Sequence, residues 1–372
     1  MISISGIYYP NKFIGKKTEK KKFINNYGKN FKKIKKGNLN IEYLDRDYKN
    51  CFFKIGKKEF CIVVGDIFDD KVIKNEISKS EYIYNSFKFK GLESINKING
   101  SFMFFIYEQN NLYLGKDQNS IIPFYYFFDK KKFIFSNDIK KILNLKLSQN
   151  INLTNIFTPI LCGGIHLDDT TFYNNIYKLE PGSFIKIINS KISINKFRYY
   201  SFIEREDKGI KYYIENASNL LENAINIRTK NLSKIILGLS GGIDSRIMLS
   251  LLRKNLIEVN TFTYGTGKFV ENDIAKKVAK LCNVPHKYFN IPRNSYIKFS
   301  NNSLIETNAI TTTNMAPQLK LFNKLRSPKS CLLFGTFLDY LIGNSGYHHE
   351  IFKINKKFEL KNHYLKGAVI KY

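Results

Sequence analysis

The feature that most constrains this chain is a short turn between an apolar strand and a helix. The strand is predicted over 235–239 (IILGL), the turn is Ser240–Ser245 (SGGIDS), and the helix that follows carries Ile247, Met248 and Leu252. Unpaired backbone N–H groups and the helix dipole converge at such a turn, and its two glycines let the backbone approach a ligand closely. The turn predicts an anion site at the end of a buried strand.

A polyphosphate chain is the anion that this turn fits best. Ser240 and Ser245 would add hydroxyl donors, and Asp244 would hold the accompanying magnesium. The turn has neither the GxxxxGK[ST] spacing nor the lysine of a Walker A site. It resembles the PP-loop of ATP pyrophosphatases, which split ATP into AMP and pyrophosphate; a purely structural glycine turn is the competing interpretation.

The second half of the chain alternates helices and strands around this turn. A helix is predicted over 211–229, a strand over 259–264, a helix through Ile274 and Leu281, and a strand over 288–291. Alternation of this kind predicts an α/β domain with a parallel sheet, whose ligands lie at the carboxyl ends of the strands.

The first half, residues 1 to about 200, consists of short β-segments separated by polar turns. The clearest of them are 59–64, 101–107, 112–114, 124–128 and 133–135. Strands this regular predict packed antiparallel sheets.

Segments along nearly the whole chain are similar to those of asparagine synthetases, in the family order. They are Met1–Ile7 (family MCGIAGI), Val64–Phe68 (NGEIY), Ile98–Phe102 (LNGxF), Lys116–Tyr126 (RDxxGxxPLYY), Thr171–Gly182 (TxFxxIxxLxPG) and, after the PP-loop, Gly335–Tyr340 (GEGxDE). The resemblance implies an α+β Ntn-hydrolase-like, glutaminase-type domain over 1–200. It implies an α/β PP-loop domain of the adenine nucleotide alpha hydrolase type over 201–372.

The resemblance also implies an ATP site. Residues expected around the pyrophosphate are Ser240, Gly241, Gly242, Asp244 and Ser245, and those expected near adenosine are Leu239, Tyr264 and Gly335. Asp244 and Asp339 would be the catalytic carboxylates and magnesium ligands, since two carboxylates can bind a cation that bridges phosphates. Arg246 either reaches a phosphate or is a solvated helix residue.

Three departures concern the glutaminase site. Ile2 stands where the family has its nucleophilic cysteine, no RGPD motif occurs in 35–60, and Val64 replaces the asparagine of NGEIY. An aliphatic side chain offers no nucleophile. We therefore expect no glutaminase activity and an amine, or ammonia, from another source.

Further departures concern the acceptor substrate. Thr336 and Tyr340 replace the two glutamates of GEGxDE, and the relatives continue in a helical segment beyond the position of Tyr372. The ligase domain is thus expected to be truncated, and aspartate is in doubt as its substrate. His348 and His349 are expected to be surface residues rather than a metal pair.

The function expected from the resemblance is an ATP- and Mg²⁺-dependent ligase. It would adenylate a carboxylate, by family default that of aspartate, and an amine would then form the amide and release AMP. The alternatives are amide ring closure, as in β-lactam synthetases and lasso-peptide cyclases, a tRNA-modifying PP-loop enzyme, and a non-catalytic ATP-binding relative. A homodimer is also open.

The composition adds little to these expectations. The formal net charge is +29, but lysine accumulates together with isoleucine and asparagine, as an A/T-rich coding sequence would produce, so nucleic acid is not the expected partner. The five cysteines lack metal-type spacing, and no apolar run reaches the length of a bilayer span. A cytoplasmic protein without disulfides, zinc or a membrane anchor is expected.

Overall fold

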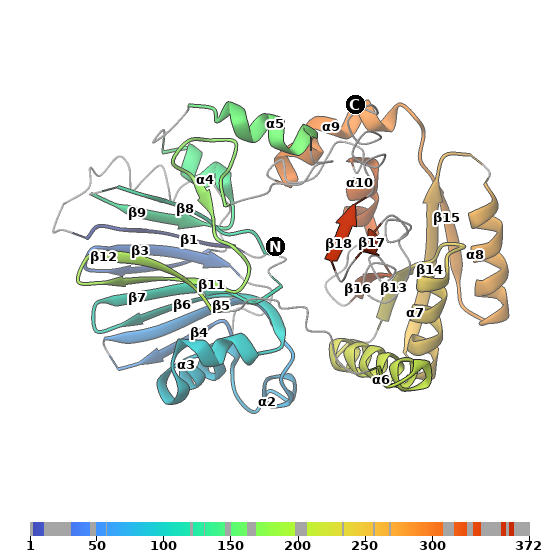
Figure 1. The fold of residues 1–372 in the computed structure, drawn as a ribbon, viewed down its shortest axis with the longest axis horizontal. Helices are drawn as coiled ribbons and strands as arrows, with labels where there is room; N and C mark the ends of the chain where they lie inside the picture. Colours follow the sequence, from blue (N-terminus) through green and yellow to red (C-terminus); the bar gives the residue numbers. More distant parts are fainter. Residues whose placement is uncertain are drawn as a thin grey trace. The chain divides into compact units, whose positions relative to one another are not determined.

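The computed structural model divides into two compact units, Met1–Glu204 and Arg205–Tyr372. Figure 1 shows the helices and strands of each unit. The residues that the structure describes are 3–10, 31–44, 50–56, 58–119, 122–129, 131–145, 150–161, 169–197, 207–232, 234–255, 257–267, 269–307, 316–325, 330–335, 351–354 and 357–360.

The N-terminal unit contains two antiparallel six-stranded sheets, as the sequence predicts. The first has the order β10-β8-β9-β1-β3-β2, and the second β12-β11-β7-β6-β5-β4. The strands of the first are β1 (Ser3–Tyr8), β2 (Lys32–Lys36), β3 (Leu39–Leu44), β8 (Tyr125–Phe128), β9 (Phe133–Ser136) and β10 (Tyr177–Lys178). Those of the second are β4 (Phe52–Ile55), β5 (Glu59–Ile67), β6 (Gly100–Glu108), β7 (Asn111–Lys116), β11 (Ser183–Ile188) and β12 (Lys191–Lys196).

The two sheets pack face to face because successive side chains of a strand point to opposite faces. On β6, Met103, Phe105 and Tyr107 enter the core between the sheets. Phe102 and Phe104, on the other face, pack beneath helical segments. The helices of this unit are α2 (Asp70–Ile73), α3 (Lys79–Lys90), the 3₁₀ segment η1 (Leu92–Lys97), α4 (Ile139–Leu143) and α5 (Leu153–Leu161).

The C-terminal unit contains a parallel four-stranded sheet of order β15-β14-β13-β16. Its elements are α6 (Ile210–Thr229), β13 (Lys234–Gly238), α7 (Ile243–Lys254), β14 (Glu258–Gly265), α8 (Val270–Leu281), β15 (His286–Asn290), α9 (Ser295–Glu306), α10 (Ala316–Leu325) and β16 (Ser330–Phe334). A hairpin of β17 (Ile351–Ile354) and β18 (Lys357–Leu360) forms a separate sheet. These elements confirm the predicted α/β order.

Each face of the parallel sheet has its own apolar layer. Leu249 of α7 and Ala275 of α8 pack with Leu237 of β13 on one face. On the other face, Phe322 of α10 contacts Phe262, at 6.4 Å between ring centroids. These layers cover the faces of the sheet, so the loops that follow the strands meet at the edge formed by the carboxyl ends of the strands.

No helix among the described residues is both long and apolar enough to cross a bilayer.

Candidate functional site

The turn Ser240–Ser245 lies where the sequence places it, between the end of β13 and the start of α7. Ile243 and Asp244 begin α7, and the first N–H groups of a helix have no acceptor within the helix. Gly242 is the N-cap residue of α7, and no side chain caps it. The amino end of α7 therefore offers donors and positive potential to an anion.

The turn is held in shape by its own two serines. The Ser245 hydroxyl, 5% exposed, lies 3.1 Å from the Ser240 hydroxyl and accepts a 3.0 Å hydrogen bond from the Ser240 amide. Gly242 N–H donates to Ser240 Oγ at 3.1 Å. We expected both hydroxyls to face the ligand, whereas the structure turns that of Ser245 into the loop.

Asp244 and Gly335 meet at this turn although they come from separate elements. A Cβ at Gly335, directly after β16, would lie 2.9 Å from the Asp244 carbonyl carbon and 3.0 Å from the Ser245 amide nitrogen. The end of β16 thus abuts the first turn of α7, which only glycine allows. The partly buried Asp244 carboxylate has no hydrogen bond or ion pair in the described part of the chain.

Leu239 and Tyr264, which with Gly335 are the three residues expected near adenosine, are placed differently from each other. Leu239 is 1% exposed, and its side chain lies in the core. Its amide donates to Phe262 O at 2.8 Å, and its carbonyl accepts a hydrogen bond from the Thr263 hydroxyl. Tyr264 is half-buried and stacks on Phe262, and burial raises the pKa of its phenol. Of these two, only Tyr264 keeps a side chain at the carboxyl edge of the sheet.

A polar layer beneath the turn has no signal in the sequence. His286 of β15 lies 3.0 Å from the Thr261 hydroxyl through Nδ1. Thr263, two residues along β14, donates to the Leu239 carbonyl. Burial lowers the pKa of His286, so its neutral form is favoured and it holds β14 and β15 together.

Asp339, the second expected carboxylate, lies outside the described residues. So do Ile2, Thr336 and Tyr340, where the sequence departs from the family pattern, and also His348, His349 and Cys162. Arg246 is exposed, and its Nε donates to Gly242 O at 3.3 Å, back toward its own helix start. The other four cysteines, which lie among the described residues, are not in disulfide bonds.

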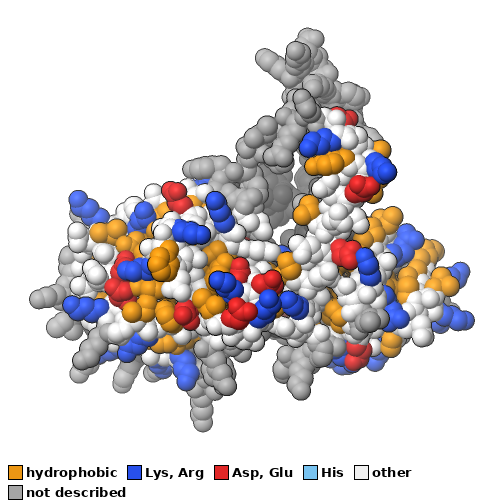
Figure 2. Space-filling model, turned by 90° about the horizontal axis from the view of Figure 1, so that it is seen from below, with side chains coloured by type: hydrophobic (Ala, Val, Ile, Leu, Met, Phe, Trp, Pro, Cys, Tyr) orange, Lys and Arg blue, Asp and Glu red, His pale blue; other side chains and the backbone are white. Residues whose placement is uncertain are grey.

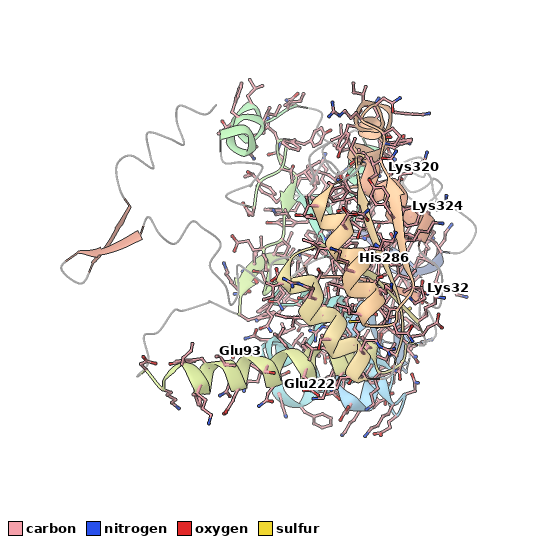
Figure 3. All side chains as sticks on the ribbon, turned by 90° about the vertical axis from the view of Figure 1, so that its right-hand side faces the viewer. Lys32, Glu93, Glu222, His286, Lys320 and Lys324 are labelled. Atoms are coloured by element: carbon pink, nitrogen blue, oxygen red, sulfur yellow. The ribbon has the colours of Figure 1, made fainter. Side chains whose placement is uncertain are left out.

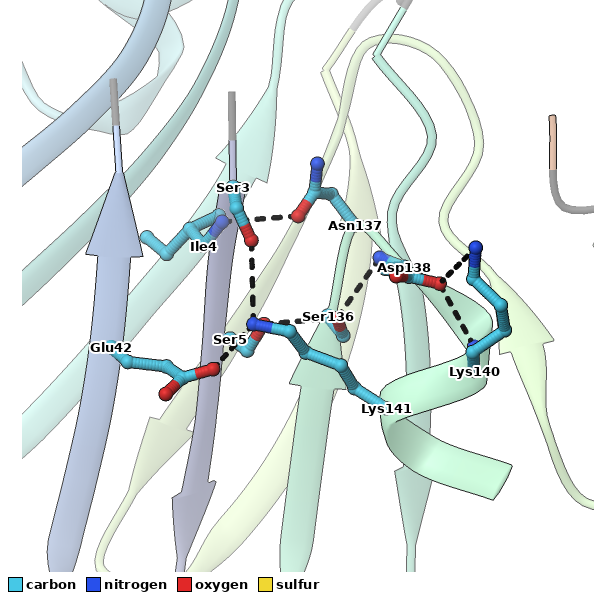
Figure 4. Close-up of polar contacts among 9 residues, drawn as sticks. All are labelled: Ser3, Ile4, Ser5, Glu42, Ser136, Asn137, Asp138, Lys140 and Lys141. Carbon is cyan, nitrogen blue, oxygen red and sulfur yellow. Dashed lines mark hydrogen bonds and ion pairs between the residues drawn. The ribbon is translucent and has the colours of Figure 1, made fainter. Parts of the chain in front are cut away.

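The N-terminal unit has a buried polar cluster around β1 (Figure 4). Lys141 of α4 forms an ion pair with Glu42 of β3, each side chain being 3% exposed, and lies 3.5 Å from the Ser3 hydroxyl. The Ser5 and Ser136 hydroxyls are 3.0 Å apart. These charged groups satisfy one another, which is a structural arrangement.

Val64, where the family pattern has asparagine, is fully buried in the core between the two sheets. Asp117, of the Lys116–Tyr126 segment, accepts from the Phe102 and Asn119 amides at 3.0 and 2.8 Å. Val64 contributes to the packing of the core, and Asp117 to its hydrogen bonding.

Basic side chains are spread over the described surface. On the face seen in Figure 2, lysines and arginines are interspersed with acidic and apolar side chains. The exposed lysines of the edge strand β2, such as Lys32 and Lys33, are typical of strands that avoid pairing with another chain.

Comparisons with known proteins agree with this architecture. A glutamine amidotransferase domain model matches residues 59–200, and an asparagine synthase model matches residues 216–362. A Methanocaldococcus jannaschii protein named as a glutamine-hydrolyzing asparagine synthetase is 28% identical over 221 residues, which is 56% of this chain and 42% of the relative.

Two further relatives are more distant. The glutamine-hydrolyzing asparagine synthetase 2 of Bacillus subtilis is 24% identical, over 58% of this chain and 32% of its own length. The microcin J25-processing protein McjC of Escherichia coli is 26% identical, over 44% of this chain and 30% of its own length. The chain thus spans less than half the length of these relatives. With both domain models matched in order along most of its length, the chain belongs to the asparagine synthetase family.

Proposed function

We propose that this chain is an ATP-dependent amide-forming ligase that activates a carboxylate and releases AMP and pyrophosphate. The observation that carries the proposal is the turn itself. A helix start without a side-chain cap, Gly335 and an Asp244 carboxylate that has no partner among the described residues meet there. The family membership supports the same chemistry.

The residues of the turn fit a magnesium–polyphosphate ligand. The amino end of α7 would bind phosphate oxygens through its N–H groups, and the Ser240 hydroxyl lies beside them. Asp244, and Asp339 by resemblance, would hold Mg²⁺, a cation that prefers carboxylate oxygens. When bound, the ion would neutralise charge on the leaving pyrophosphate.

Catalysis by this chain would rest on position and charge. The Ser240–Ser245 hydrogen bonds keep the loop in one shape, so its donors need no rearrangement when charge develops. The acceptor carboxylate would attack the α-phosphorus, pyrophosphate would leave, and an amine would then displace AMP.

The amine is proposed to come from outside the chain. The buried Val64 and the Ile2 substitution leave the amidotransferase unit without the asparagine of the NGEIY segment and without the family's nucleophile. We therefore propose that the N-terminal unit has no glutaminase activity. Aspartate is the family-default acceptor, and ring closure within one substrate is the alternative.

The test is ATP–pyrophosphate exchange by the purified chain with aspartate and a panel of other carboxylates. We expect Asp244→Asn to lower exchange on the order of 100-fold, as loss of one charge-stabilising group does. Asp273→Asn is the matched control, since Asp273 is an exposed aspartate in the first turn of α8. ATP binding without exchange for any carboxylate would overturn the ligase proposal and identify a non-catalytic relative.

A further inference from the structure

A pocket of about 420 Å³ lies at the carboxyl end of β15, in the C-terminal unit. Its walls come from the end of β15 and from helices α9 and α10. Its size falls in the range of small-molecule sites in proteins. A four-carbon diacid such as aspartate would fill only a small part of it.

The walls of this pocket are apolar and aromatic. Phe289 of β15, Phe299 of α9 and Leu321 of α10 line it, together with Ile291. Phe289 and Phe299 are half-buried, so each keeps part of its ring open to a ligand. Walls of this kind favour an apolar or aromatic body.

Two lysines add positive charge to the pocket. Lys320 and Lys324 both line it, are exposed, and lie four residues apart on one face of α10. Figure 3 shows them next to each other beyond the end of β15, with His286 further down that strand. Lys320 Nζ lies 3.8 Å from the centre of the Phe299 ring.

This charge is not neutralised within the described part of the chain, where neither lysine has a carboxylate within ion-pair distance. Two like charges at this spacing repel each other and lower helix stability. Ser295, the first residue of α9, also lines the pocket, so the positive end of that helix adds to the same potential. The arrangement fits an anionic group at the rim and an apolar body inside.

The pocket and the Ser240–Ser245 turn share one edge of the sheet. Ile291 N–H donates to Gly265 O at 2.7 Å, and the Thr266 hydroxyl donates to Ile291 O at 2.9 Å, so the loops after β14 and β15 are joined. β15 lies two strands from β13 in the sheet order, which is a spacing of roughly 10 Å.

We propose that this pocket recognises the acceptor substrate as an acid larger than aspartate. The substrate would carry one carboxylate on Lys320 and Lys324, an apolar or aromatic segment against Phe289 and Phe299, and a second carboxylate at the turn. This inference rests on the proposed function for the role of the second carboxylate, and on the pocket alone for binding.

The probe is the dipeptide aspartyl-phenylalanine, which has these three parts, and its C-terminal amide is the matched compound without the outer carboxylate. Binding is measured by calorimetry without ATP, on the full chain. We expect Lys320→Gln/Lys324→Gln to weaken dipeptide binding about fivefold or more and to leave amide binding unchanged. Lys277→Gln, an exposed lysine of α8 outside the pocket, should bind as the unaltered chain does.

Exchange assays then separate the two proposals. The dipeptide concentration that gives half-maximal exchange should be lower than the aspartate concentration that does so. It should be higher again in the Lys320→Gln/Lys324→Gln variant. Dipeptide binding that is absent, or equal in the double variant, overturns the pocket assignment even if aspartate supports exchange. Normal, lysine-dependent binding without exchange for any acid overturns the ligase proposal and leaves the pocket as an acid-binding site.

Discussion

The two units differ in how they treat charged and polar side chains. In the N-terminal unit the buried lysines have partners: Lys141 pairs with Glu42, and Lys79 donates to Gly65 O at 2.8 Å. In the C-terminal unit the Asp244 carboxylate and the two pocket lysines have no such partner among the described residues. Buried charged groups that pair with other protein groups are typical of the structural core. Charged groups that have no protein partner and lie at a helix start or a pocket are typical of ligand sites.

The largest expected effect comes from the buried pair of the N-terminal unit. Lys141→Met leaves Glu42 charged and buried without a partner, which should lower the free energy of unfolding by about 3–5 kcal/mol. Urea denaturation followed by circular dichroism measures it. Lys140→Met is the control, because the Lys140–Asp138 pair is 3.8 Å apart and partly exposed, and should cost below about 1 kcal/mol.

A double variant sharpens this result. Glu42→Leu together with Lys141→Met removes both charges and should recover most of the lost stability. A cluster with a catalytic role would instead show little stability change in the single variant, and equal losses for Lys140→Met and Lys141→Met would contradict the structural interpretation.

Next in size is the difference between the responses of the chain to magnesium–ATP, which the C-terminal unit should bind, and to glutamine, which the N-terminal unit should not. Magnesium–ATP at about 100 times its dissociation constant should stabilise the C-terminal unit by about 2.7 kcal/mol. Amide hydrogen exchange should slow in α7 and the turn before it. Glutamine should not slow amide hydrogen exchange in either unit. Slower amide exchange in the N-terminal unit with glutamine would contradict the proposal that this unit has lost its glutamine site.

A single methyl group at Gly335 should have a smaller but clear effect. Its Cβ would press on the Asp244 and Ser245 backbone, so Gly335→Ala should lower ATP–pyrophosphate exchange at least about tenfold by displacing the start of α7. Ser250→Ala is the control, since Ser250 is an exposed residue further along the same helix, α7. Equal exchange rates in both variants would show that the contact is unimportant.

The smallest effect concerns Lys116, which is 2% exposed and donates to Leu179 O at 3.3 Å. Burial lowers its pKa to about 7. Between pH 7 and the ordinary lysine pKa, Lys116 is protonated in the unfolded chain but mostly neutral in the folded chain. The free energy of unfolding therefore rises with pH in this window. Lys116→Met should flatten the rise, by about 1 kcal/mol, in urea titrations at pH 7 and 8.

Lys97→Met, an exposed lysine of η1, is the control for this pH series. It should keep the slope of the unaltered chain. A slope that survives in Lys116→Met would mean that Lys116 stays charged when folded.

The sequence predicts local features well and long-range ones poorly. The apolar, aromatic run in 101–107 and the apolar strand before Ser240 predict β6 and β13 because each signal lies within a few consecutive residues. The Lys141–Glu42 ion pair joins residues 99 positions apart, so no short sequence pattern predicts it.

The candidate site shows the same division. The strand–SGGIDS–helix order indicates the anion turn directly, yet the inward hydroxyl of Ser245 depends on its contact with Ser240 in the folded loop. The pocket at β15 gathers Phe289, Phe299 and Lys320 from three elements, and each alone is an ordinary surface or core residue in the sequence.

The hydroxyl contact between Ser240 and Ser245 also bears on how fast a nucleotide can exchange. A loop held in one shape by its own hydrogen bonds has little conformational entropy left to lose when a ligand binds. Association should then proceed in a single kinetic phase, with no slow loop rearrangement before or after the encounter. Residence time would be set by the strength of the phosphate contacts, and the turn would act as a fixed template over many cycles of release and reloading.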